Sequence, residues 1–309
     1  MAIINKAAFA KALWPGVNAW YGKAYGEYPV MHTKLFDTYS STKYREEDVG
    51  VVSFGLAAQK PEGTGVSYDT ETQGFVTSYS HVTYGLGFII TDEAIEDDQY
   101  MVIGERKSKG LAFSMRQTKE IVAHNIYNRA FNTAYTYGDG KALLVSDHPN
   151  ISGGTWSNVL ATAADLSEVA LEQAVIDISL YTNDRGLRIH VLPKSLIIHP
   201  NGMFEAKRIL GSPLQSGNSN NDINVLKSMG YFSDVVVSPY LTDTDAWFIR
   251  TNVPEGLKHF ERRADEFTED NDFDTDNLKY KAVARYSFGC TDPRSLYGSP
   301  MLLPTSRQQ

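Results

Sequence analysis

The chain has 309 residues but only one cysteine, Cys290, and no long run of apolar residues. A single cysteine excludes an intrachain disulfide framework. No stretch approaches the roughly 18 consecutive apolar residues that a membrane-spanning helix needs. The apolar patches before Trp20 are interrupted by Lys6, Lys11 and Pro15, so no signal peptide is predicted. We therefore expect a protein that stays in the cytoplasm of the cell that makes it and has no membrane partner.

An excess of positive charge is lacking as well. The formal net charge is −8 and the sequence pI is near 5.4. Proteins that bind nucleic acid by neutralising phosphates are normally basic, so this charge argues against such a function. The hydrophobic content of 42% and charged content of 21% are ordinary for a folded protein. The length allows one large domain or two moderate ones.

Motifs that carry catalysis or bind cofactors are also lacking. The segment Gly138-Asp139-Gly140-Lys141 has neither the spacing nor the Ser/Thr of a P-loop, and no G-x-S-x-G sequence occurs. The seven histidines form no H-E-x-x-H or paired Cys/His pattern: His32, His81, His124, His148, His190, His199 and His259. We predict no catalytic, cofactor-binding or metal-ligating residues and no enzymatic activity.

Two short stretches imitate functional sites. The acidic run 270–277 resembles a calcium loop that starts at Asp272, but Asn277 stands where glycine is required and Val283 where a bidentate Glu is required. Ser146, Asp147 and His148 are neighbours in sequence, which does not make a spatial triad. We interpret the first stretch as an acidic turn and the second as a loop.

The sequence does contain elements too long for one chain to bury. Tyr39–Leu56 and Phe75–Thr91 are rich in Val, Thr, Tyr and Phe, and they flank the turn-rich stretch 60–65, which predicts a hairpin. Each arm of about 16 residues would span roughly 50 Å. Because a lone two-stranded ribbon is marginally stable in water, we expect this one to contact other copies of the chain.

A very long helix is predicted after the hairpin. Asp92 is the expected N-cap, and the expected helix runs from there to about Thr133 without a proline. Gly104 and Gly110 are expected to bend or split this helix. Some 40 helical residues would span about 60 Å, whereas a compact globule of this length is about 50 Å across. The molecule should therefore be flat or elongated.

The remaining chain predicts a mixed section and a closing strand. Asp165 is expected to cap a second helix, with Glu168 completing the capping box. A short helix is expected near Met203–Leu210. Short strands are expected at Leu187–Leu192, Leu196–Ile198, Val235–Val237, Ala246–Thr251 and Leu257–Arg262. In the closing strand one alternating set should face the core, namely Leu278, Tyr280, Ala282, Ala284, Tyr286 and Phe288.

Taken in order, several segments resemble the major capsid proteins of tailed bacteriophages. They are 12–17 and 20–22, then 85–91 continuing through Glu96-Asp97, then 148–149 with 153–158, then 244–249, and finally 278–287 closing on 297–299. Within that group it resembles the proteins similar to the Mu-type head subunit, with the Hong Kong 97-type shell fold. The likeness spans nearly the whole chain, and its specificity comes from the order and spacing of motifs that are individually weak.

This resemblance implies an α+β fold with an N-terminal arm, an extended hairpin loop, a long spine helix, a peripheral domain and an axial domain. The expected division is an arm (1–38), a hairpin loop (39–91), a peripheral domain with the spine helix (92–150), an axial domain (151–264), and a return strand of the peripheral domain with the C-terminal tail (265–309).

The resemblance also implies function and partners. Copies would form hexamers and pentamers of an icosahedral head that encloses double-stranded DNA, first in the host cytoplasm and then in the virion. Portal and scaffold or decoration proteins would be further partners. The DNA would be touched only through non-specific proximity, which suits an acidic chain. Lys60 at the hairpin tip could form an isopeptide bond with a neighbour, although a solvated turn residue is the simpler interpretation.

Three alternatives remain open from sequence. An encapsulin-like nanocompartment would have the same fold but enclose protein instead of a genome. Another virion component, such as a tail or connector protein, would form tubes or rings. A soluble enzyme would need a cleft within residues 140–265 that contains a strongly perturbed carboxylate or histidine.

Overall fold

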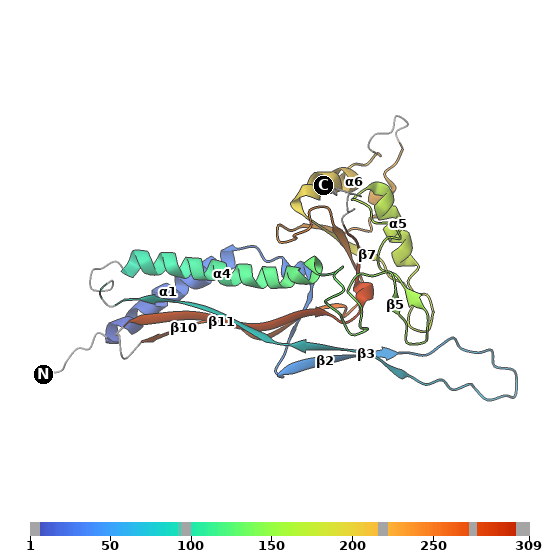
Figure 1. The fold of residues 1–309 in the computed structure, drawn as a ribbon, viewed down its shortest axis with the longest axis horizontal. Coiled ribbons are helices and arrows are strands. Elements are labelled where there is room, and N and C mark those ends of the chain that lie inside the picture. Colours follow the sequence, from blue (N-terminus) through green and yellow to red (C-terminus); the bar gives the residue numbers. More distant parts are fainter. Residues whose placement is uncertain (1–6, 92, 94–99, 216–221, 272–276, 301–309) are drawn as a thin grey trace, which may run out of the picture.

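The computed structural model describes residues 7–91, 93, 100–215, 222–271 and 277–300. Figure 1 shows an elongated layered part, a more compact part above one end of it, and a two-stranded ribbon that projects from their junction. The predicted elongated shape is therefore correct.

The described helices and strands follow one another in mixed runs, as in an α+β protein. The helices are α1 (Ala7–Glu27), α2 (His32–Leu35), α4 (Tyr100–Asn128), α5 (Glu168–Ser179), α6 (Met203–Gly211) and α7 (Val225–Met229), with short 3-10 turns η1 (Pro200–Gly202) and η2 (Pro293–Ser295). The strands are β1 (Asp37–Ser40), β2 (Arg45–Val52), β3 (Thr72–Ser80), β4 (Val82–Ile90), β5 (His148–Pro149), β6 (Thr155–Trp156), β7 (Pro193–Ile198), β8 (Asp234–Val237), β9 (Trp247–Thr251), β10 (Leu257–Asn271), β11 (Leu278–Cys290) and β12 (Leu296–Ser299).

The elongated part is a four-stranded sheet covered on one face by α1 and α4. Its strand order is β1-β10-β11-β4, and β10 and β11 form a long antiparallel pair. The predicted alternation of β11 is confirmed, because Tyr280, Ala282, Ala284 and Tyr286 are each at most 5% exposed. These side chains share a core with α1 and α4. Phe288, at the end of the series, is only partly buried.

The long helix α4 lies along this sheet as one continuous element of 29 residues, about 44 Å at the usual rise per residue. Gly104 and Gly110 lie inside it and do not split it, contrary to our expectation. The predicted N-cap, Asp92, lies outside the described residues.

The N-terminal arm is more regular than predicted. α1 continues through Pro15. Val17, Tyr21 and Ala24 lie one helical turn apart and are buried against α4 and the sheet. The spacing of these three apolar residues indicates a helix, but Pro15 just before them argues against one. The arm is thus a layer of the elongated part instead of a loose strap.

The compact part is a second four-stranded sheet, β12-β9-β7-β8, with helices on one face. Trp247 and Ile249 of β9 face α5, α6 and α7. Phe248, between them, faces the opposite way and packs with Tyr127 and Leu143 near the end of α4. Alternate residues of one strand therefore join the two parts of the molecule through continuous apolar packing.

The hairpin region differs from the prediction in three ways. Residues 39–56 are not one strand, since β1 pairs in parallel with β10 whereas β2 pairs with β3. The second arm breaks at His81, whose ring nitrogens lie 3.0 Å from Ser287 Oγ and 3.1 Å from Ser41 Oγ. β3 therefore belongs to the ribbon and β4 to the main sheet. The paired ribbon is shorter than expected, roughly 26–30 Å.

Three smaller predictions were wrong. α5 is capped by Ser167, whose Oγ accepts the Ala170 amide at 3.2 Å, and not by Asp165. Residues 187–192 form only an isolated bridge between Thr182 and Arg188. β10 does not end at Arg262 but continues to Asn271, so it includes the start of the acidic run. The other expected strands and the helix at α6 are confirmed within a few residues.

We predict that Ala284→Asp destabilises the fold. Ala284 is 5% exposed in the core beneath the helices. A carboxylate there would be buried without a partner, at a cost of about 3–5 kcal/mol in the free energy of unfolding. Chemical denaturation of the unassembled subunit measures the change. Lys281→Asp, on the exposed face of the same strand, is the control and should shift the midpoint little. Equal midpoints for the two variants would show that the face assignment is wrong.

Candidate assembly surfaces

The ribbon made by β2 and β3 carries apolar side chains that the described residues of this chain leave exposed. Its strand ladder runs from Arg45 paired with Ser80 to Val52 paired with Thr72, and residues 53–71 continue beyond it without strand structure. The large apolar side chains near the tip are Val51 (62% exposed), Phe54 (52%), Leu56 (84%), Val66 (57%) and Tyr68 (92%). Exposed apolar surface of this extent marks a site of interaction with another molecule.

The base of the ribbon is fixed to the main sheet by an aromatic anchor. The Tyr79 hydroxyl lies 2.6 Å from Thr291 Oγ1, and its ring packs edge-on against Phe260 at 4.9 Å between centroids. The ring lies over Gly289, where a Cβ atom would come within 2.6 Å of it. Only glycine at this position allows β3 to cross β11 so closely.

Charged contacts secure the ribbon to both parts of the molecule. Lys258 of β10 is 6% exposed and its ammonium forms an ion pair with Asp48 of β2, which also accepts the Thr291 hydroxyl at 2.8 Å. From the compact part, Arg185 donates to the Thr70 carbonyl at 2.9 Å. The ribbon thus has a defined direction although its tip is uncovered.

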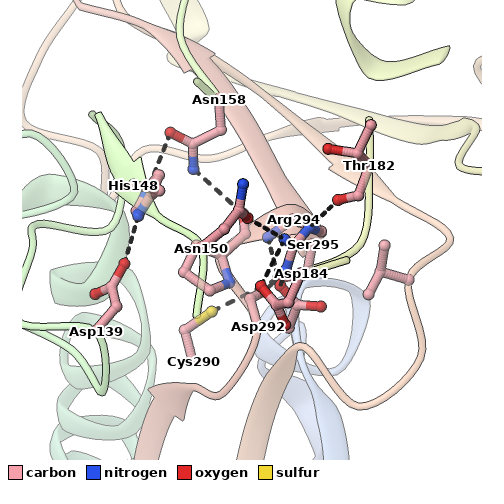
Figure 2. A network of polar contacts seen from close by, with 12 residues as sticks. Asp139, His148, Asn150, Asn158, Thr182, Asp184, Cys290, Asp292, Arg294 and Ser295 are labelled. Carbon is pink, nitrogen blue, oxygen red and sulfur yellow. Dashed lines mark hydrogen bonds and ion pairs between the residues drawn. The ribbon is translucent and has the colours of Figure 1, made fainter. Parts of the chain in front are cut away.

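A buried polar network lies at the junction of these parts. Figure 2 shows His148 between Asp139 and Asn158, with Nδ1 2.6 Å from the carboxylate and Nε2 3.2 Å from the amide oxygen. Asn158 also donates to the Leu143 carbonyl at 2.8 Å. Both ring nitrogens of His148 are therefore engaged by structural partners. Ser146 is not one of them, so these three residues do not form a triad. Residues 146 and 147 lie in a loop, as interpreted, whereas His148 begins the short strand β5.

Arg294 continues this network toward the compact part. Its Nη2 lies 3.1 Å from Asp184 Oδ1, its Nε donates to the Thr182 carbonyl at 2.9 Å, and its guanidinium stacks 4.5 Å from the centre of the Trp156 ring. The side chain is 10% exposed. A buried, hydrogen-bonded and paired guanidinium of this kind holds segments in register, and removing one partner would leave an uncompensated charge.

A second group of buried ionisable side chains lies between α4 and the sheets. Glu120 is fully buried, and its carboxylate lies 2.6 Å from His32 Nδ1 and accepts the backbone amides of Met31 and His32. Burial alone would raise the pKa of Glu120, but these hydrogen bonds lower it. His124 joins Glu120 to the compact part, since its Nδ1 is 2.7 Å from the Glu120 carbonyl and its Nε2 is 2.7 Å from Ser238 Oγ.

His259 is buried in the same region, but hydrogen bonds do not satisfy both of its ring nitrogens. It is 1% exposed, stacks on Phe288 at 4.3 Å, and its Nε2 has no hydrogen-bond partner. Burial, together with the nearby charges of Lys119 and His32, lowers the pKa of His259 to about 3. The ring is therefore neutral at ordinary pH and acts as part of the core.

The residues that could have suggested chemistry have structural roles. His32, His81, His124, His148 and His259 are buried, and His190 is exposed. Cys290 is fully buried, and burial raises the pKa of its thiol. Within the described ranges, no three His, Cys, Asp or Glu side chains converge as a metal site. Residues 272–276 of the acidic run lie outside those ranges.

None of the described helices is long and apolar enough to cross a membrane.

The sequence predicted the hairpin tip with Lys60, but it did not predict the residues that fix the ribbon to the rest of the chain. Tyr79, Lys258 and Arg185 act through partners more than 100 residues away in the chain. The turn around Gly186, which has a positive φ of 77°, positions Arg185.

Comparison with known proteins gives one family match and several similar folds. Residues 74–299 match the family described as phage capsid protein, and no curated protein matches the sequence. The structure from Mycobacterium phage Patience has a TM-score of 0.55 and 11% identity, covering 98% of this chain and 90% of that one. The procapsid of bacteriophage JBD30 gives 0.53 and 15%, covering 98% and 78%. The virus-like particle from Pyrococcus furiosus gives 0.52 and 12%, covering 92% and 97%.

We predict that acid destabilises the subunit through His259. Its pKa is lower in the folded state than the ordinary value of about 6.5, so the unfolded chain binds a proton first. The stabilising contribution is therefore complete above about pH 6.5 and is lost as the pH falls toward 3. His259→Phe, which cannot titrate, should flatten this part of the curve of unfolding free energy against pH. Denaturant titrations of the unassembled subunit between pH 4 and 7 measure it.

Exposed His190→Phe is the matched control and should leave the slope of the parent chain unchanged. If the parent and the His259→Phe variant lose stability equally between pH 6.5 and 4, another histidine whose pKa is lowered by burial, His124 foremost, causes the acid sensitivity.

Proposed function

Because this chain belongs to the phage capsid protein family, and is therefore a structural component of a virion shell that assembles from its own copies, we propose that the uncovered ribbon joins each copy to its neighbour in that shell. The α+β capsid fold of the Hong Kong 97 type, which the sequence resemblance implied, is confirmed by the similar solved folds. Membership of a structural family also accounts for the lack of catalytic motifs.

The observation that carries this proposal is the contrast between the two ends of the ribbon. Tyr79 and Lys258 fix its base, whereas Leu56 and Tyr68 at the tip are 84% and 92% exposed. A fixed base limits the entropy lost when the tip docks, and fully burying each apolar side chain would contribute about 1.5–3 kcal/mol. The ribbon is thus preorganised to bind a surface that the described part of its own chain does not provide.

The two sheets support a division into a peripheral and an axial part. We assign α1, α4 and the sheet β1-β10-β11-β4 to the peripheral part, and α5–α7 with the sheet β12-β9-β7-β8 to the axial part. The expected boundary after residue 264 would cut β10, so we place it before Leu257 instead. The axial part would surround the centre of hexamers and pentamers.

The proposed content of the shell is double-stranded DNA. An encapsulin-like shell with protein cargo is the second candidate, and the likeness to the virus-like particle from Pyrococcus furiosus favours keeping it. Nuclease-protected DNA in particles purified from the native source would support a phage head, and protein cargo without DNA would support the nanocompartment. The family match to capsid proteins argues against a tail or connector protein.

Several finer points remain predictions from the sequence resemblance. They are kinship with the Mu-type head subunit and contacts with portal, scaffold or decoration proteins. A covalent bond through Lys60 is another. Lys60 lies in the exposed tip, so its ammonium is accessible to a neighbouring chain.

We predict that deleting residues 56–68, with Asn-Gly joining Gly55 to Asp69, prevents assembly without unfolding the subunit. This deletion keeps the hydrogen bond from the Gly55 amide to Asp69 and the contact of Arg185 with Thr70. It removes three of the exposed apolar side chains. The melting temperature should be nearly unchanged, while particles should be absent by electron microscopy and sedimentation.

A matched pair of full-length variants separates the length of the tip from its chemistry. Leu56→Ser with Tyr68→Ser should raise the critical concentration for assembly by about 100-fold, because roughly 3 kcal/mol of apolar contact is lost per copy. Thr64→Ser should leave that concentration unchanged. Normal particles from the deletion variant would contradict the role of the ribbon.

A further inference from the structure

The outer surface of the axial part contains an apolar groove between α5 and α7. Its volume is about 400 Å³. Most of its lining is apolar. The apolar lining includes Val175 and Ile176 of α5, Leu180 directly after that helix, and Val225 and Met229 of α7. Ile176, Leu180 and Met229 are 51%, 51% and 58% exposed. The groove is therefore open to a ligand and has no apolar cover within the described part of the chain.

The groove follows from the way α5 divides its faces. Leu171, Ala174 and Ile178 point into the core and are fully buried. Val169, 74% exposed, lies on the opposite face with Ile176 and Leu180 at helical spacing. A surface helix normally presents polar residues there. A second apolar stripe therefore indicates a second packing partner.

A complementary surface lies on α6 of the same part. Ala206 and Ile209 anchor this helix in the core, which leaves Phe204 pointing outward at 68% exposure. Lys207 and Arg208 follow one turn later on the outward side and are exposed. Arg208 has a partner in its own chain, Glu205 at 2.8 Å, but an exposed pair of this kind contributes little stability.

The two surfaces match in shape and in charge. The groove has room for a phenyl ring, and Glu172 lies half-buried on its rim. The sequence of α5 contains Glu168, Glu172 and Asp177 but no basic residue. The outward side of α6 instead offers two cations beside an apolar side chain. Opposite charges at the edge of an apolar contact fix its register and disfavour wrong pairings.

We propose that Phe204 of one copy inserts into the α5–α7 groove of the next copy around a ring of axial parts. This inference rests on the proposed function, because a ring requires two different surfaces on each chain that meet head to tail. Lys207 and Arg208 then lie near Glu172 of the neighbouring copy. The contact repeats from chain to chain and closes at the pentamer or hexamer.

Engineered disulfides test this contact in assembled particles. The only native cysteine, Cys290, is fully buried and will not compete. The variant with Phe204→Cys and Ile176→Cys is assembled, oxidised mildly and run on a denaturing gel without reductant. We expect a ladder of cross-linked chains that ends at the pentamer and hexamer and collapses to monomer on reduction. Each single variant should give no ladder.

The matched control pairs Phe204→Cys with Ile121→Cys, which is 48% exposed on α4 of the peripheral part. It should give no ladder. Particles that form normally but show no more cross-linking than this control would overturn the contact and leave the proposed function intact. A chain that remains monomeric under all assembly conditions would overturn both.

A charge exchange gives an independent test that does not depend on disulfide geometry. Glu172→Lys and Lys207→Glu should each raise the critical concentration for assembly by about 5- to 10-fold, in line with a loss of roughly 1 kcal/mol per contact. The double variant restores the attraction with reversed signs and should recover most of the loss. If the two effects simply add, the residues do not meet and the proposed contact is wrong.

Discussion

The structure depends on one constraint: the chain extends a ribbon whose apolar side chains its own described residues do not cover. A two-stranded ribbon buries few side chains when neither of its faces packs against another layer. Here the tip leaves Leu56 and Tyr68 almost fully in solvent. A monomer gains nothing from such a surface, whereas a shell can cover it in every copy. Assembly therefore completes the packing of the subunit.

Buried charge has the opposite role, since it fixes the two parts within each copy. Glu120, His32 and His124 connect α4 to both sheets, and Arg294 connects the compact part to the segment before β12. Such networks tolerate little displacement, because a broken contact leaves an unpaired charge in the interior. These networks therefore permit only small rotations between the two parts of the subunit.

The sequence predicted elements whose periodicity comes from burial on one face, and it failed where tertiary contacts override the pattern. β11 was predicted residue by residue because its inward side chains are apolar. β10 was predicted too short because its inward positions after Arg262 include Asp265, a carboxyl group that needs the Tyr21 hydroxyl of α1 as its partner. No local rule pairs residues so far apart. The ribbon was found as a candidate surface, but its anchors were not, for the same reason.

The ribbon is attached to both parts of the molecule, so the position of its tip depends on how the two parts are oriented. Asp48 of β2 ties the ribbon to the elongated part, and Thr70, just before the start of β3, ties it to the compact part. A small rotation between the two parts therefore swings the far end through a much larger arc. Copies that sit where a closed surface bends sharply would aim their tips differently from copies on flat facets, so one sequence can serve both environments without any change in its core.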